Sequence, residues 1–248
     1  MRFFASAEQR SGDELVLSET DAVHVSRVLR MKKGAEIIVC DDAGSEHVCV
    51  LEEVGKDRVA ARIVSSRPYS TEPSVGVTVF AALSKGERFD YLIQKCVEVG
   101  ADAIVPFVSE RCVARPDARD YERKHARFAR IALEASKQAL RSKPVPVSEI
   151  VSFEQALRMA SGCPVSLLLY ERENRRSLSD ILRRSEGCAR YAVMTGPEGG
   201  FSEDEARLAL QSGLESVSIG PRILRCETAP VAAVCAIMYH TGNYDIGV

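Results

Sequence analysis

The pattern of apolar and polar positions changes near residue 70 and divides the chain into two parts. In the first part the apolar positions form short runs rich in valine and isoleucine, and turns containing glycine and aspartate separate them. Such runs predict β-strands. They cover residues 14–17, 36–40, 46–54 and 58–64. Together they predict a small β-barrel over residues 1–70.

One helix is expected to interrupt these strands. Ser18 with Asp21 three residues later is typical of a helix start. An apolar stripe follows at helical spacing: Ala22, Val25, Val28 and Leu29. Another face carries His24 and Arg27, which are three residues apart, with Arg30 close to the same line. Residues 67–73 contain two prolines and small polar residues, which predicts an extended linker.

The second part, residues 74–248, alternates apolar runs with amphipathic segments. Strands are expected at 75–83, 103–108, 165–170, 191–195 and 216–219. Helices are expected at 87–99, 120–140 and 229–240. The strands are apolar almost throughout, as in a parallel sheet covered by helices on both faces. The last helix is apolar nearly all round, so it must be buried in the domain or in a subunit interface.

Composition narrows the class of protein. Apolar residues make up 46% and charged residues 27% of the 248 positions, a globular balance. No run reaches the roughly 18 apolar residues of a membrane helix, and the polar start does not predict a signal peptide, so the cytoplasm is expected. The eight cysteines form no Cys-x-x-Cys pair and the four histidines are scattered, so neither a metal site nor a disulfide framework is expected.

Charge alone does not identify a nucleic-acid binder, because the formal net charge is only −2. The distribution is uneven, however. Residues 107–147 hold ten Lys and Arg against five Asp and Glu. Such a run is more often a solvated helix face, but it can also attract phosphates.

The first candidate motif follows the predicted strand 191–195. It reads Thr195, Gly196, Pro197, Glu198, Gly199, Gly200 and Phe201. Three glycines let the backbone turn sharply and approach a ligand closely. Ser202 with Glu205 predicts the start of the next helix. A strand, a glycine loop and a helix are typical of nucleotide sites, although a tight connection without a ligand has the same pattern.

Two further motifs also follow strands. The first runs from Ile219 and Gly220 through Arg222, Ile223, Leu224 and Arg225 to Glu227, and its two arginines are either plain surface residues or phosphate ligands. The second is Ser84 to Arg88, which includes Lys85; by itself it is typical of a polar loop. The chain contains no phosphate loop of the NTPase type, no Gly-x-Gly-x-x-Gly and no Gly-x-Ser-x-Gly, so NTPases, standard dinucleotide enzymes and serine hydrolases are not indicated.

Taken together and in this order, the motifs resemble the RsmE family, the 16S rRNA uridine-N3 methyltransferases of the SPOUT class. The matching segments are His24–Met31, Lys85–Arg88, Lys95–Gly100, Ser109–Arg111, Gly196–Gly200 and Ile219–Ala229. The chain departs from the family where Lys137 replaces the glutamate of Glu-Gln-x-x-Arg, Leu140 replaces a common glycine, and Cys226 replaces a more usual threonine. The resemblance implies a PUA-like β-barrel RNA-binding domain (1–70) and an α/β SPOUT methyltransferase domain with a trefoil-knotted parallel sheet (74–248).

The resemblance also implies S-adenosylmethionine as cofactor, 16S rRNA or the 30S subunit as partner, and a homodimer. The expected cofactor-binding residues are Thr195, Gly196, Pro197, Glu198, Gly199, Gly200, Ile219, Gly220, Ile223 and Leu224. Arg225 is the candidate to stabilise a uracil anion, and Glu227 to orient Arg225 or act as base. The expected RNA contacts are His24, Arg27, Arg30, Lys85, Arg88 and Arg111.

Three other functions stay open at this point. A SPOUT enzyme with another RNA target would share the same catalytic motifs. A non-catalytic RNA-binding protein would explain the barrel and the basic segment, but not the glycine loops. A nucleotide-dependent enzyme acting on a small molecule would need no RNA at all.

Overall fold

The computed structural model describes residues 1–56, 58–113 and 118–245, and the side chains of residues 118 and 119 are outside the description. The chain forms two compact units. The first unit contains Met1–Glu72 together with Ser136–Pro144, and the second contains Pro73–Ala135 together with Val145–Val248. The sequence pattern did not anticipate that residues 136–144 pack with the N-terminal strands.

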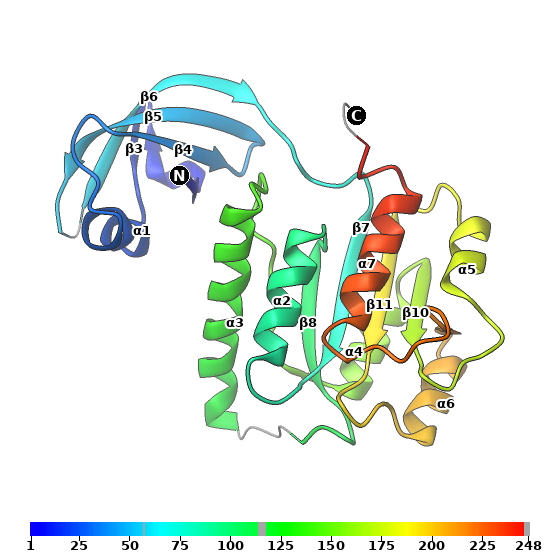
Figure 1. Cartoon of the computed structure of the whole chain (residues 1–248). Helices are drawn as coiled ribbons and strands as arrows, with labels where there is room; N and C mark the ends of the chain where they lie inside the picture. The colour runs from blue at the N-terminus through cyan, green and yellow to red at the C-terminus, as the bar shows by residue number, and fades with distance from the viewer. Residues whose placement is uncertain (57, 114–117, 246–248) are drawn as a thin grey trace. The chain divides into compact units, whose positions relative to one another are not determined.

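The first unit is built on a six-stranded, curled sheet of order β1-β4-β5-β6-β3-β2 (Figure 1). All neighbouring strands are antiparallel except β1 and β4. Its concave core is made by apolar side chains such as Phe3, Leu15, Val39 and Leu51. The strands are β1 Arg2–Ala5, β2 Arg10–Ser11, β3 Glu14–Val16, β4 Glu36–Asp41, β5 Ser45–Val54 and β6 Val59–Pro68.

The helix of this unit is shorter than its apolar pattern suggests. α1 (Glu19–Val23) starts where the Ser18 hydroxyl accepts the N–H of Asp21 at 3.2 Å, and a π-helical turn (His24–Val28) follows. In that turn the N–H of Leu29 donates to the carbonyl of His24, five residues back. The wider turn rotates the following residues, so Val28 is 67% exposed and does not belong to the predicted apolar stripe.

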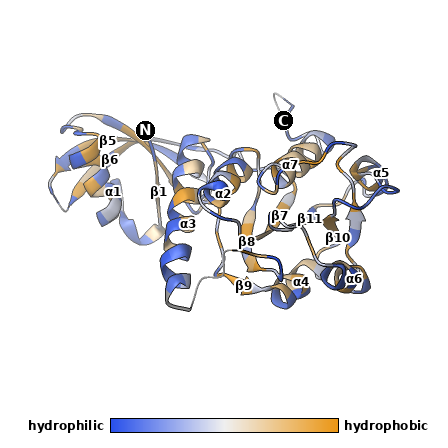
Figure 2. Ribbon diagram, turned by 60° about the horizontal axis from the view of Figure 1, so that its bottom comes forward, coloured by the Kyte–Doolittle hydropathy of each residue, from blue (hydrophilic) through white to orange (hydrophobic). Residues whose placement is uncertain are grey.

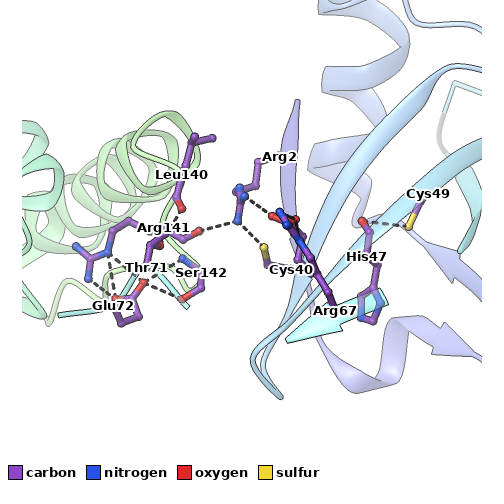
Figure 3. A network of polar contacts seen from close by, with 11 residues as sticks. Arg2, Cys40, His47, Cys49, Arg67, Thr71, Glu72, Leu140, Arg141 and Ser142 are labelled. Carbon is purple, nitrogen blue, oxygen red and sulfur yellow. Dashed lines mark hydrogen bonds and ion pairs between the residues drawn. The ribbon is translucent and has the colours of Figure 1, made fainter. Parts of the chain in front are cut away.

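Residues 136–144 enter the first unit through a network of polar contacts (Figure 3). Arg141 Nε donates to the carboxylate of Glu72 at 3.1 Å, and the backbone N–H of Ser142 donates to the same carboxylate at 3.0 Å. Arg2 is paired with Glu46 and donates to the carbonyl of Arg141. These contacts tie the end of a helix that begins elsewhere into the sheet of the first unit.

The second unit contains a six-stranded parallel sheet of order β12-β10-β11-β7-β8-β9, with helices on both of its faces (Figures 1 and 2). Its strands are β7 Gly76–Ala82, β8 Ala103–Val108, β9 Val151–Ser152, β10 Val165–Leu169, β11 Arg190–Thr195 and β12 Glu215–Val217. Its helices are α2 Arg88–Glu98, α3 Ala118–Gln138, α4 Phe153–Ser161, α5 Leu178–Arg184, α6 Glu203–Gln211 and α7 Ala229–His240; the last three residues of α3 belong to the first unit.

The observed sheet confirms the predicted α/β class. Every residue of β10 is buried, as expected for a strand covered on both faces. Val193, Leu167 and Ile237 of α7 belong to one continuous core. The trefoil knot implied by the resemblance stays a prediction.

Candidate active site

A pocket of about 540 Å³ lies at the carboxyl ends of β10, β11 and β12 in the second unit. Parallel strands bring their carboxyl ends to one edge of the sheet, which is where α/β proteins bind ligands. The two glycine motifs follow β11 and β12, so the fold brings them together here. All ten predicted cofactor-binding residues line the pocket, as do Arg88, Arg225 and Glu227.

The first glycine loop is anchored by Glu205, the buried first-turn carboxylate of α6. Glu205 accepts the N–H of Ser202 at 3.0 Å, which closes the predicted capping box. It also accepts the hydroxyl of Ser109 at 3.1 Å and the N–H of Glu110 at 2.9 Å. Glu205 therefore joins the loop after β8 to the start of α6 and fixes the position of the glycine loop between β11 and α6.

The glycines of this loop are required partly by the protein itself. A Cβ on Gly196 would lie 3.2 Å from backbone atoms of Gly200 and Phe201. Gly200 has φ +65°, and its Cβ would lie 2.5 Å from Oε1 of Glu171. Of the three glycines, only Gly199 has room for a side chain, because a Cβ there would lie at an ordinary contact distance of 3.4 Å from Arg111. The close approach of the backbone to a ligand, expected for these glycines, therefore applies most directly to Gly199.

Glu198 is engaged by the protein. Its carboxylate accepts the backbone N–H of Lys85 at 2.9 Å and pairs with Arg88 at 3.2 Å. Burial alone would raise the pKa of the Glu198 carboxyl, but these two donors outweigh burial and the pKa is lowered. Glu198 thus links the loop after β7 to the glycine loop.

The second loop presents Arg225 and Glu227 to the pocket. The Arg225 side chain is exposed and makes no hydrogen bond or ion pair with any residue that the structure describes. The Cys226 thiol donates to the Glu227 carboxylate at 3.2 Å. Burial, with help from Glu227, raises the pKa of Cys226 to about 12. Glu227 was expected to orient Arg225. Among the described residues, its carboxylate instead accepts a hydrogen bond from Cys226 and has none from Arg225.

The predicted RNA contacts fall into two groups. Lys85, Arg88 and Arg111 lie around the first glycine loop, where Arg111 donates to the carbonyl of Gly199 at 3.1 Å. His24, Arg27 and Arg30 lie in the first unit. Arg27 and Arg30 are exposed and His24 is half-buried. Each group therefore belongs to a single unit.

The structure adds pocket residues that the motifs did not reveal. Leu169, Tyr170 and Glu171 line the pocket from the end of β10. A sequence signal was present, because charged residues at a strand end tend to face the ligand crevice in α/β folds. No glycine follows β10, so the glycine motifs do not include the end of this strand. Val217 and Ser218 also line the pocket, from the end of β12, together with Arg222, Cys226 and Ala229 of the second glycine motif.

Within the described residues, no group of three or more His, Cys, Asp or Glu side chains is placed to hold a metal ion. In the same part of the chain, no helix has the length and apolar character needed to span a membrane. All eight cysteines are free thiols.

Comparison with known proteins agrees with this architecture. The sequence model of the RNA methyltransferase domain family matches residues 71–238. The sequence model of the RNA methyltransferase PUA domain family matches residues 17–64. The ribosomal RNA small subunit methyltransferase E of Bacillus subtilis is 34% identical over 223 residues, which are 88% of this chain and 87% of that protein.

Two solved structures resemble the whole chain. A methyltransferase from Legionella pneumophila with bound S-adenosylmethionine is 30% identical, with a TM-score of 0.86 over 96% of each chain. The ribosomal RNA small subunit methyltransferase E of Neisseria gonorrhoeae, also bound to S-adenosylmethionine, is 34% identical, with a TM-score of 0.84 over 96% of each chain. This chain therefore belongs to the RNA methyltransferase family that includes ribosomal RNA small subunit methyltransferase E, the RsmE family.

Proposed function

We propose that this protein transfers a methyl group from S-adenosylmethionine to N3 of a uridine in 16S rRNA. The observation that carries the proposal is the joining of both glycine loops at one pocket, in a chain whose relatives of the same family bind S-adenosylmethionine. The uridine-N3 target comes from the resemblance to the RsmE family. The cytoplasm follows from the ribosomal substrate as part of the same proposal.

The pocket fits this cofactor in size and in chemistry. Its volume of about 540 Å³ lies within the usual range for small-molecule sites. Residues 196–200, 219, 220 and 222–224 surround it, and apolar residues such as Leu169 and Leu224 line it. S-adenosylmethionine supplies a methyl group on a sulfonium, which is already activated for transfer. The protein's task is to bind, orient and exclude water.

The residues of the second loop must deal with the proton on N3. Methylation forms a nitrogen–carbon bond at N3 and releases that proton, so the uracil passes through a state with negative charge on its ring. The Arg225 guanidinium, without a partner among the described residues, is free to stabilise that charge electrostatically. Glu227 is the candidate to accept the proton, directly or through water, and its contact with Cys226 fixes its carboxylate.

RNA recognition is assigned to the six predicted contact residues. Because N3 lies on the Watson–Crick edge, the target uridine must be unpaired or flipped out of a helix. Arg88 lines the pocket, and Lys85 and Arg111 lie beside its first glycine loop, so all three suit the phosphates next to that uridine. His24, Arg27 and Arg30 would hold RNA on the first unit, and shape and phosphate contacts would dominate there.

The active enzyme is proposed to be a homodimer joined through α7. One face of α7 is buried in the core of the unit by Ala233, Val234, Ile237 and Met238. The other face is also apolar and is only partly covered: it carries Val231, Ala232, Cys235, Ala236 and Tyr239. A second apolar face on a surface helix suits a self-complementary twofold contact.

The competing functions are less well supported. A non-catalytic RNA-binding protein would not need a pocket between two glycine loops, and an enzyme acting on a small molecule would not need a PUA domain. Another RNA target is the alternative that the site geometry does not separate from the proposal. The relatives named for the small ribosomal subunit favour 16S rRNA.

Radiolabelled methyl transfer tests the proposal. The purified chain is incubated with labelled S-adenosylmethionine and 30S subunits from a strain that lacks the modification, and the RNA is digested to nucleosides. Label in N3-methyluridine is the expected result. Label in another nucleoside would overturn the target, and no label together with no cofactor binding by calorimetry would overturn the enzymatic function.

A further inference from the structure

Three carboxylates line the pocket, and two of them already have partners in the protein. Glu198 accepts from the Lys85 N–H and from Arg88, and Glu227 accepts from the Cys226 thiol. Glu171, which follows β10, has no hydrogen bond or ion pair with any described residue. An ionised carboxylate only accepts hydrogen bonds, so Glu171 offers two unused acceptor oxygens to whatever fills the pocket.

The position of Glu171 is set by the sheet. β10 and β11 are parallel neighbours, and Leu169 pairs in register with Thr195, the last residue of β11. Two residues beyond Leu169, Glu171 therefore lies beside the first glycine loop. Its Oε1 occupies space that a side chain at Gly200 would need, 2.5 Å from the position of a Cβ there. The glycine leaves room for this carboxylate at the edge of the pocket.

This placement resembles that of a ribose-binding acid. In dinucleotide-binding α/β folds the glycine loop follows one strand, and a carboxylate from another strand accepts a hydrogen bond from a ribose hydroxyl. Here β11 carries the glycine loop, and β10 is the adjacent strand that carries Glu171. We propose that Glu171 binds the ribose hydroxyls of the adenosine part of S-adenosylmethionine. The inference rests on the proposed function, because it assumes that cofactor.

The proposal separates Glu171 from the other carboxylates of the pocket. Hydrogen bonds to a charged acceptor contribute more than neutral ones, so losing this contact should weaken binding by roughly 10-fold. The alternative partner for Glu171 within the same cofactor is the ammonium group of its methionine part. A ligand that has the ribose but lacks the amino acid distinguishes the two.

Calorimetry on the full chain tests the proposal with two such ligands, S-adenosylhomocysteine and 5′-methylthioadenosine. Glu171→Gln should lower the affinity for both ligands by a similar factor of roughly 10. The 2′-deoxy form of methylthioadenosine should bind wild type more weakly than methylthioadenosine does, and the variant should lose this discrimination. Glu203→Gln is the matched control, since it removes an exposed carboxylate of α6 that does not line the pocket.

The outcomes are distinct. Unchanged affinity of Glu171→Gln for methylthioadenosine, with weaker binding of S-adenosylhomocysteine, would assign Glu171 to the ammonium group and overturn the ribose proposal. Unchanged affinity for both ligands would overturn any role in cofactor binding. Failure of wild type to bind S-adenosylhomocysteine would instead overturn the proposed function. Thermal unfolding without ligand should be the same for both variants, since the Glu171 side chain is exposed.

Discussion

Arg225 is the residue whose proposed role depends least on the fold. Its side chain lines the pocket, is exposed, and makes no hydrogen bond or ion pair with any described residue. Arg225→Ala should therefore change the free energy of unfolding by no more than about 0.5 kcal/mol. It should lower kcat by about 100-fold or more, because a preorganised positive group would be lost. Affinity for S-adenosylhomocysteine should stay the same.

Single-turnover methyl transfer and calorimetry measure these two effects separately. Arg190→Ala is a suitable control, because Arg190 is an exposed arginine at the start of β11 and does not line the pocket. Full activity in Arg225→Ala would remove this residue from the mechanism. A parallel loss of cofactor affinity would assign it to binding instead.

Gly199 and Gly200 make a matched pair for testing why the first loop needs glycine. Gly200 has φ +65°, so Gly200→Ala should destabilise the protein by about 1–2 kcal/mol. Gly199→Ala meets only an ordinary contact with Arg111, so stability should be nearly unchanged while cofactor affinity falls. Urea unfolding and calorimetry check the two effects. Gly199→Val with wild-type affinity would show that this position does not approach the cofactor.

At the scale of elements, the segment 136–144 is held in the first unit by Arg141 and Glu72. Their side chains are only 4% and 15% exposed. Removing one partner of a buried pair leaves an uncompensated charge, so Arg141→Ala should destabilise the first unit by about 3 kcal/mol. The exposed pair Arg62–Glu52 in the same unit is the control, and Arg62→Ala should cost less than about 1 kcal/mol. Equal costs for the two variants would contradict the role given to the network.

The same pair makes stability depend on pH. Burial alone would raise the pKa of Glu72, but hydrogen bonds from Arg141 and Ser142 outweigh it and lower the pKa below its usual 4.5. A carboxyl whose pKa is lowered by folding stabilises the protein above its unfolded pKa and loses that effect as pH falls through the folded pKa. The stability difference between wild type and Glu72→Gln should thus be constant near pH 7 and shrink below about pH 4.5. A difference that grew on acidification would contradict this.

Most elements were predictable from the sequence because their apolar periodicity is strong, as in α2 and β8. The elements that differ from the prediction do so for local reasons. β1 (Arg2–Ala5) is only four residues long and pairs with β4, which is distant in sequence. The long helix was expected to reach residue 140, but Leu140 has φ +57°, a conformation that ends a helix. Lys137, which replaces the glutamate of the family pattern, pairs with Asp21 at 2.7 Å, a partner 116 positions away that the sequence pattern does not indicate.

The sequence was sufficient to predict which loops form the candidate site. Both glycine motifs and Arg225 were located because they follow apolar strands. The partners of individual side chains were not predictable, because they depend on which strand ends become neighbours. The contact of Glu198 with Lys85 and Arg88 joins segments more than 100 residues apart. The position of Glu171 beside Gly200 could not be predicted for the same reason, since only the β10–β11 pairing brings the two together.

For the whole molecule, the apolar outer face of α7 predicts association. Tyr239 is 79% exposed on this face. Tyr239→Arg would place a charge in the proposed interface and should convert a dimer into a monomer, as measured by light scattering after size exclusion. Val64→Arg is the control, because Val64 is a 55% exposed apolar residue of β6 in the other unit. A monomeric wild type would contradict the dimer directly.

The proposed function requires that this pocket methylate one uridine on its Watson–Crick edge. Because a methyl group on N3 blocks base pairing, reverse transcriptase should stop at the modified nucleotide. We would map stops on 16S rRNA from modification-deficient 30S subunits treated with wild type or with Arg225→Ala. We expect one new stop at a uridine with wild type and a greatly reduced stop with the variant. No enzyme-dependent stop, with methyl label found elsewhere in the RNA, would contradict the proposed function.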